Sequence, residues 1–348
     1  MASSLTPAGT KQLRRFRRLG IAAIVSVYLV ILAGGIVRMT GSGMGCPDWP
    51  KCFGQWVPPT HVSQLPADYQ QRFDLHGHGV DEFNAAKTWT EYINRTIGAL
   101  SGLVILVFAV YSLPFLRKKG YRYLSGLAVF TLLLMGFQGW LGSVVVSTNL
   151  APYMVTIHML VAILIVCLLV LAVALPRLSK ERTPLRAAPL LRSLAVGGFL
   201  VILFQTALGT QLREAIDTVA EQGNTARDNW VSNAGGVFYV HRSFSWLVVI
   251  LTLVQWWFVR KSIGVLGQKA PLTIANALLA IMLAEVALGI LLANAGLPAF
   301  AQPLHLLFAS LLAGLQFALL ILVFRQFQPQ GQNTISNETM KVSEATSP

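Results

Sequence analysis

The sequence predicts an all-α integral membrane protein in which eight transmembrane helices form two pseudo-symmetric four-helix bundles. Three observations support this fold class. Of the 348 residues, 54% are hydrophobic and only 12% are charged, which is too apolar for a soluble protein. Eight apolar stretches approach the roughly 20 residues that a helix needs to cross a bilayer. The second half of the chain also repeats the first at a fixed spacing.

The apolar stretches divide the chain into segments. The eight expected helices cover residues 20–39, 92–115, 122–146, 152–175, 190–211, 236–259, 271–293 and 300–324. A basic tail (1–19) precedes a first bundle (20–176), which includes a long loop at 40–90. The second bundle covers 189–325. The tail at 328–348 is rich in Ser, Thr, Asn and Gln, and we expect it to be disordered.

The distribution of charge predicts the orientation in the membrane. With the N-terminal "KQLRRFRR" in the cytoplasm, the inner segments hold 19 Lys and Arg against 3 acids. The outer segments, with long loops at 40–90 and 212–235, hold 8 against 11. This positive-inside bias explains the net charge of +13 without a nucleic-acid partner. We expect a multi-pass protein of the cell inner (plasma) membrane, in contact with lipid, with both termini cytoplasmic.

An internal repeat relates the two halves. Residues 139–159, "GWLGSVVVSTNLAPYMVTIHM", match residues 286–306, "VALGILLANAGLPAFAQPLHL". The pairs separated by 147 residues are Gly142 and Gly289, Leu150 and Leu297, His158 and His305, Asn94 and His241, and Arg95 and Arg242. "GGIVR" (34–38) and "GTQLR" (209–213) extend the match to the first and fifth helices. The expected copies are parallel and related by an axis along the membrane normal.

Three histidines, His158, His241 and His305, lie inside predicted spans near their outer ends. Ionisable residues in a membrane usually face the bundle interior and have a partner there. A lone histidine is best explained by an interhelical hydrogen bond, but two facing imidazoles can bind a haem iron from both sides in a four-helix bundle. His241 and His305 suit that arrangement. A zinc site would need further ligands, which the pattern does not supply.

Four arginines stand at predicted outer helix ends, two in each repeat: Arg38, Arg95, Arg213 and Arg242. Each by itself could be a side chain that reaches from the apolar region to the membrane surface. Together, around histidines at the same depth, they fit cationic partners of haem propionates. In the first repeat the ligand positions hold Asn94 and His158, so a bis-histidine haem cannot form there. The sequence therefore predicts one saturated electron-transfer haem and one chemically open haem site.

These residues bring in a resemblance to a known family. The run "GGIVRMTGSGMGCPDWPKC", the Glu-x-x-x-Arg that opens the second helix, "FQGWLGSVVVSTNL", "LGTQLRE" and the "HR" of the sixth helix resemble heme A synthase of bacteria and mitochondria. The resemblance covers about residues 20–325. It implies oxidation of the C8 methyl of heme O, through an alcohol and a gem-diol, to the formyl group of heme A for terminal oxidase assembly.

The resemblance also implies roles for residues. A haem b would be ligated by His241 and His305, near Arg242 and Arg213, in the second bundle. The substrate heme O would bind in the first bundle near the residues Glu91, Asn94, Arg95, Arg38 and the iron ligand His158. Asn94 departs from the family, whose usual motif is Glu-x-x-His-Arg. Glu91 matches the family's functional glutamate, although its spacing also fits a capping box with Thr88 and an ion pair with Arg95.

Two cysteines, Cys46 and Cys52, share the first outer loop in an oxidising compartment, so a disulfide is expected. The resemblance implies a redox role for the pair; a loop staple and two free thiols are the alternatives. Cys167 is interpreted as packing. Glu285 and its repeat partner Gln138 lie deep in their helices, and a buried acid there is either a neutral hydrogen-bonding group or part of a proton path.

Two other functions remain open on the sequence alone. A di-haem cytochrome b that exchanges electrons with quinone would need two bis-histidine sites. A transporter would need a polar site at the membrane midplane, where this chain has few polar residues. The expected partners are a heme O synthase, terminal oxidase assembly factors and an unidentified electron donor. Whether the chain forms a homo-oligomer is also left open.

Overall fold

The computed structural model describes residues 7–75, 77, 79–178, 183–263 and 269–328. Within these ranges, eight helices are long and apolar enough to cross a membrane, which confirms the predicted all-α membrane fold class. Their bounds are α1 Pro7–Met39, α3 Ala85–Ser112, α4 Arg122–Ser147, α5 Pro152–Ala174, α6 Ala188–Glu221, α8 Gly236–Ser262, α9 Lys269–Asn294 and α10 Ala301–Gln326. Apart from Gln328, the tail expected to be disordered lies outside the described residues.

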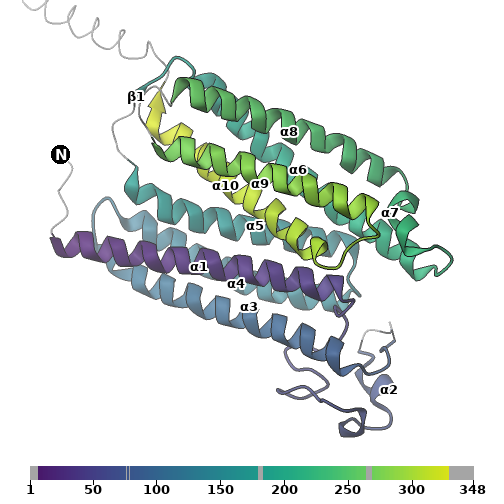
Figure 1. Cartoon of the computed structure of the whole chain (residues 1–348). Coiled ribbons are helices and arrows are strands. Elements are labelled where there is room, and N and C mark those ends of the chain that lie inside the picture. Colours follow the sequence, from purple (N-terminus) through teal and green to yellow (C-terminus); the bar gives the residue numbers. More distant parts are fainter. Residues whose placement is uncertain (1–6, 76, 78, 179–182, 264–268, 329–348) are drawn as a thin grey trace, which may run out of the picture.

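Short elements complete the described chain. They are α2 Tyr69–Phe73, α7 Trp230–Asn233, the 3₁₀ turns Val62–Gln64, Leu113–Arg117, Leu175–Arg177 and Arg227–Asn229, and the strands β1 Thr183–Pro184 and β2 Phe327–Gln328. The two strands pair in parallel and tie the segment before α6 to the end of α10. Most of the structure outside the long helices lies in the first outer loop and between α6 and α8 (Figure 1).

The long helices pack as two rings of four. In the first ring α1 contacts α3, α3 contacts α4, α4 contacts α5, and α5 returns to α1. In the second ring α6, α8, α9 and α10 make the corresponding contacts. Contacts of α10 with α1 and α5, and of α5 with α6, join the rings (Figure 1). The result is two four-helix bundles side by side, with α1, α5, α6 and α10 at the interface.

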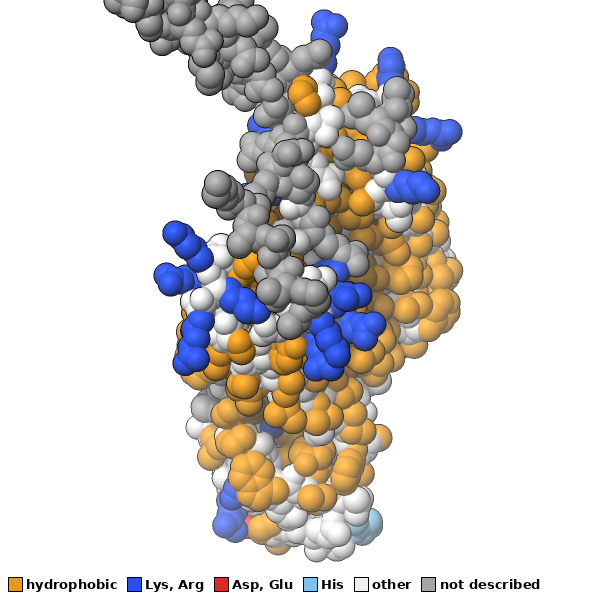
Figure 2. Space-filling view, turned by 90° about the vertical axis from the view of Figure 1, so that its left-hand side faces the viewer, with side chains coloured by type: hydrophobic (Ala, Val, Ile, Leu, Met, Phe, Trp, Pro, Cys, Tyr) orange, Lys and Arg blue, Asp and Glu red, His pale blue; other side chains and the backbone are white. Residues whose placement is uncertain are grey.

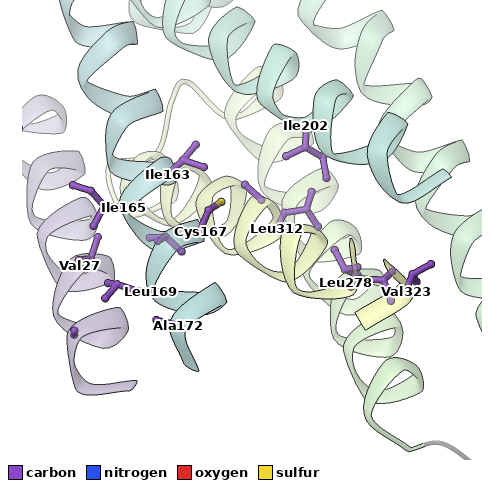
Figure 3. Close-up of a cluster of buried hydrophobic side chains, with 14 of the residues drawn as sticks. Val27, Ile163, Ile165, Cys167, Leu169, Ala172, Ile202, Leu278, Leu312 and Val323 are labelled. Carbon is purple, nitrogen blue, oxygen red and sulfur yellow. The ribbon is translucent and has the colours of Figure 1, made fainter. Parts of the chain in front are cut away.

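The main cluster of buried apolar side chains runs through both bundles. Figure 3 shows Val27 of α1, Ile163 of α5, Ile202 of α6 and Leu312 of α10 within it. Large apolar side chains also cover the outer surface of the helices, as expected for lipid-facing positions. Because lipid is as apolar as these side chains, close packing rather than water exclusion must hold the helices together.

Charge separates the two ends of the bundle. Figure 2 looks onto the end that carries the N-terminal part of α1, where Lys and Arg gather. The described basic residues at this end include Lys11, Arg14, Arg15, Arg18, Lys118, Lys119, Arg122, Arg192, Arg260, Lys261 and Arg325. Among the described residues, the acids lie in the loops and helix ends of the opposite side, apart from Glu285 within α9.

The start of α3 differs from the expected one. Asn84 caps the helix, because its side chain accepts a hydrogen bond from the backbone N–H of Lys87. The capping-box interpretation of Thr88 and Glu91 is therefore wrong, since both lie inside the helix. The Thr88 hydroxyl instead donates to the carbonyl of Gly45, 2.9 Å away in the preceding loop. This contact brings the outer loop against the first turns of α3.

Two other helices are longer than expected. The first begins at Pro7, inside the basic tail, and α6 continues to Glu221, past its expected end at residue 211. The apolar stretch alone defined the expected bounds, whereas polar helical turns can continue beyond the bilayer. In α6 the added turns carry Arg213, Glu214 and Asp217, whose ion pairs are described below.

Candidate functional site

Each of the three intramembrane histidines packs against a glycine of the preceding long helix. The pairs are His158 of α5 with Gly142 of α4, His241 of α8 with Gly209 of α6, and His305 of α10 with Gly289 of α9. A Cβ atom added to these glycines would lie 3.5, 3.2 and 3.5 Å from the histidine Cε1. A methyl group at Gly142 or Gly289 would be in ordinary van der Waals contact with the ring, whereas one at Gly209 would require the His241 ring to shift slightly. Small residues of this kind let membrane helices and their side chains approach closely.

A polar side chain stands four residues before each of these glycines. Gln138 donates from Nε2 to the backbone carbonyl of His158 at 2.9 Å. Gln205 donates to the carbonyl of His241 at 3.0 Å. Glu285 places Oε1 3.1 Å from Nδ1 of His305.

Sequence reasoning left Glu285 and its repeat partner Gln138 open between a neutral hydrogen-bonding role and a proton path, and it missed Gln205. Each is followed by x-x-x-Gly in a helix that precedes a histidine helix. That shared spacing was the signal available in the sequence.

The second bundle brings His241 and His305 face to face. Their ring centres are 6.5 Å apart and the ring planes are inclined by 71°. If each imidazole nitrogen bonds a shared metal ion at about 2 Å, adding the half-width of each ring places the two ring centres roughly 6 Å apart. Within the described residues no group of three or more His, Cys, Asp and Glu side chains could hold a metal ion. The donor set therefore fits an iron with two axial imidazoles better than a zinc ion.

The matching corner of the first bundle has neither the imidazole nor its polar neighbour. Asn94 occupies the position of His241, and its Oδ1 is buried without a hydrogen-bond partner. Gly34 of α1 matches Gly209, yet a Cβ added there would meet no atom within 4 Å. Val30 stands four residues before Gly34, where α6 has Gln205. His158 is thus the one imidazole among the ligand positions of the first bundle.

Glu91 is buried near the N-terminal end of α3, with 3% of its surface exposed. Its Oε2 accepts the backbone N–H of Cys46 at 2.7 Å. Its Oε1 accepts two hydrogen bonds from Arg95, one turn later in the helix. The i,i+4 pair anticipated from the sequence is therefore present, and the carboxylate also reaches the outer loop.

Arg95 holds the same loop by its backbone. The guanidinium donates to the carbonyl oxygens of Cys46 at 2.9 Å, Asp48 at 2.6 Å and Lys51 at 3.0 Å. Sequence reasoning expected Arg95 beside a haem propionate. The structure directs it to the loop and to Glu91.

The loop itself is closed by a disulfide between Cys46 and Cys52, whose Cα atoms are 4.9 Å apart. Both cysteines are fully buried and pack with Phe53 and Tyr69. The Asp48 carboxylate accepts the backbone N–H groups of Phe53 at 2.6 Å and of the next residue at 2.9 Å. Asp48 was not singled out from the sequence. Cys167, by contrast, is a free thiol in the apolar core.

Arg38 and Arg213, placed by sequence reasoning at different haem sites, meet at the interface of the bundles. Arg38 of α1 bonds Asp217 of α6 at 2.9 Å and Glu214 at 3.2 Å. Arg213 bonds the other oxygen of Asp217 at 2.8 Å, and Gln302 of α10 at 2.8 Å. The Nε of each arginine is buried without a partner, so each retains at least this N–H as a donor. Their pairing with Arg38 was missed because that arginine lies on a helix distant in the sequence.

Arg242 lies apart from this interface cluster. Its side chain is on the exposed face of α8, where the guanidinium stacks over Phe238 at 5.5 Å and Tyr239 at 5.4 Å from the ring centres. Stacking of this kind favours an arginine close to the membrane surface. The four arginines predicted to act alike are therefore in three different environments.

Comparisons with known proteins cover nearly the whole chain. A family model described as "Cytochrome oxidase assembly protein" matches residues 17–317. The heme A synthase of Beijerinckia indica is 30% identical over 337 residues, covering 84% of this chain and 89% of that protein. That of Rhodospirillum centenum is 27% identical over 325 residues, covering 82% and 84%. That of Shewanella oneidensis is 32% identical over 188 residues, 53% of each chain.

Proposed function

Because this chain belongs to the COX15-CtaA family of cytochrome oxidase assembly proteins, we propose that it is a heme A synthase. It would oxidise heme O to heme A for the assembly of terminal oxidases. The observation that carries the proposal is that the two bundles have different side chains at their ligand positions. One holds a facing pair of imidazoles 6.5 Å apart. The other offers His158 with Asn94 at the second ligand position, beneath a buried carboxylate.

The second bundle is the cofactor half. A haem b bound there would supply electron transfer, because two axial histidines leave no free position on its iron. His241 and His305 would be the ligands. Glu285 would fix the orientation of the His305 ring, as partners of metal-bound histidines commonly do, and Gln205 would hold the backbone of His241. The unpaired Nε of Arg213 suits a propionate, and Arg242 is a further candidate for the same role.

The first bundle is the substrate half. Heme O would bind with its iron at His158 and its propionates toward Arg38, whose Nε is unpaired. Two successive oxidations of the C8 methyl give an alcohol and then a gem-diol, which loses water to form the aldehyde. Glu91 is the candidate catalytic residue, since a carboxylate can accept the proton of the alcohol or diol hydroxyl. Asn94 would leave the iron with one strong protein ligand.

The proposed substrate implies partner proteins, and the distribution of charge implies an orientation in the membrane. Heme O must come from a heme O synthase, and its product must pass to terminal oxidase assembly factors. The basic end of the bundle supports an inner-membrane protein with cytoplasmic termini, under the positive-inside rule. That orientation sets Glu91, the disulfide loop and the interface cluster toward the outer face.

The test is the conversion itself. The protein is expressed with a heme O synthase in a host that lacks its own heme A synthase, and extracted haems are separated by chromatography and identified by mass. We expect heme A in cells with the wild-type chain and strongly reduced heme A with Glu91→Gln. A di-haem electron carrier would leave heme O unchanged. If an intact, haem-loaded protein yields no hydroxylated or formylated haem, the proposal fails.

A further inference from the structure

The guanidinium of Arg95 has no N–H left for a substrate. An arginine side chain carries five N–H donors. In this structure two of them bond Glu91, and three bond the carbonyl oxygens of Cys46, Asp48 and Lys51. A propionate could bind Arg95 only by displacing these bonds. Arg38 and Arg213, which each keep an unpaired Nε, are not constrained in this way.

The loop that Arg95 holds has its own rigid support. The Cys46–Cys52 disulfide closes it, and the Asp48 carboxylate binds two N–H groups within it. The ring of Phe53 packs edge-on against three aromatic rings, those of Tyr69, Phe73 and Phe83, at 6.0, 5.5 and 5.7 Å between centres. These contacts favour a rigid loop backbone over a mobile one.

The loop also lies directly on α3. A Cβ added to Gly45 would come within 2.6 Å of the Lys87 carbonyl oxygen and 2.9 Å of the Thr88 nitrogen, so no larger residue fits without a shift of backbone. This contact aligns the N–H of Cys46 with Glu91. The carboxylate thus accepts the N–H of Cys46 and two hydrogen bonds from Arg95.

The equivalent region of the second bundle lacks this arrangement. Phe238 stands 147 residues after Glu91 and Arg242 stands 147 after Arg95. There the arginine stacks on the phenylalanine, and no carboxylate or disulfide loop takes part. The unit of carboxylate, arginine and loop is therefore confined to the bundle assigned to the substrate.

We propose that Arg95 and the disulfide loop (residues 45–54) form a rigid mount that positions the Glu91 carboxylate. Arg95 is then a positioning residue that acts through Glu91, not an anchor for a haem propionate. The disulfide acts as the staple that keeps the Cys46 N–H and the three carbonyl oxygens in place. This inference rests on the proposed function for the role of Glu91, but the mount itself can be tested without turnover.

The first test is a double-mutant cycle on heme O conversion, with Glu91→Gln, Arg95→Gln and the double variant. If Arg95 acts through Glu91, the double variant is no slower than Glu91→Gln within about twofold, and the apparent KM for heme O stays unchanged. Arg95→Lys should have a higher kcat than Arg95→Gln but a lower one than wild type, because lysine keeps the positive charge beside Glu91 but lacks the paired N–H groups of the guanidinium. Losses that multiply, with a raised KM in Arg95→Gln, would overturn the proposal in favour of substrate binding.

The second test measures the loop directly. The rate at which dithiothreitol reduces the Cys46–Cys52 bond is followed in purified protein by maleimide labelling and peptide mass mapping. We expect Arg95→Gln to accelerate reduction by about tenfold or more, because the loss of three carbonyl bonds lets the buried disulfide open to solvent. Arg72→Gln, a change of an exposed arginine in the same outer region, should leave the rate unchanged.

The outcomes remain separable. Haem b content, which depends on the other bundle, reports for each variant that the chain has folded. If wild-type protein converts no heme O, the proposed function fails, while the reduction rates still decide whether Arg95 holds the loop. A wild-type reduction rate in folded Arg95→Gln would overturn the mount.

Discussion

Asn94 and Val30 distinguish the first bundle from the second at the scale of single residues. In the second bundle Gln205 and His241 form a ligand corner on Gly209. The first bundle has replaced both the ligand and its polar partner, although its glycine, Gly34, is still present. The absence of both groups from this corner supports the proposed difference between the two haem sites.

The predicted behaviour of Asn94→His follows from this corner. No atom lies within 4 Å of a Cβ at Gly34, so an imidazole has room there. We expect the low-spin haem b spectrum and the haem b content to stay at wild-type values, because His241 and His305 lie in the other bundle. Optical and electron paramagnetic resonance spectra of the purified variant measure this, with Asn94→Ala for comparison. A lost low-spin signal would mean that the sites are assigned the wrong way round.

Residues predicted from the sequence fall into two groups. The facing of His241 and His305 followed from a repeat and from helix direction, both visible in one sequence. The partners of Arg38 did not, because Glu214 and Asp217 lie on α6 and reach Arg38 only once the bundles are in contact. The roles expected for Arg95 and Thr88 also changed. Each depends on where the loop at residues 45–54 lies, and no spacing rule encodes that position.

At the scale of elements, α6 shows how polar groups hold the core of the second bundle. Gln316 of α10 donates to Gln255 of α8 and to the carbonyl of Ala195 in α6, both at 3.0 Å, and Gln255 donates to the carbonyl of Leu194 at 2.9 Å. Both glutamines are buried. Hydrogen bonds of this kind between membrane helices contribute about 0.6 kcal/mol on average.

Two adjacent glycines of α6 give a matched test of this packing. A Cβ at Gly198 would collide with Gln255 and lie 2.8 Å from Gln316, whereas a Cβ at Gly197 would meet nothing within 4 Å. We expect Gly198→Ala to destabilise the purified protein by about 1–3 kcal/mol through overpacking. Gly197→Ala should be neutral or stabilising by about 0.5–1 kcal/mol through helix propensity. Thermal unfolding in detergent measures both; equal shifts would contradict the packing described.

Helix existence was predictable here, and helix ends were less so. Apolar length fixes where a chain can cross a bilayer, so all eight spans were anticipated. The end of α6 depends on ion pairs beyond the bilayer, and the start of α3 on the cap provided by Asn84. Neither is visible in hydropathy, which explains why the expected bounds were shorter.

At the scale of the whole molecule, the two bundles share one apolar cluster but have different buried side chains in the half that lies toward the basic end. Gln255 and Gln316 correspond, 147 residues earlier, to Phe108 and Leu169, which are fully buried. Among the described residues, the ion pairs that join the bundles lie at the other end, where Asp217 joins Arg38 to Arg213. The sequence predicted two bundles but not their shared face, since helices that are apolar on all sides do not indicate a partner.

The central claim is that the two bundles divide the work, with a haem b in the second and the substrate in the first. Its most direct test is the low-spin haem b content of purified His158→Ala and His305→Ala, measured by absorbance and electron paramagnetic resonance. We predict that His158→Ala keeps its haem b at the wild-type level while heme O conversion falls. We also predict that His305→Ala loses most of its haem b. Loss of the low-spin haem in His158→Ala, with retention in His305→Ala, would contradict the account.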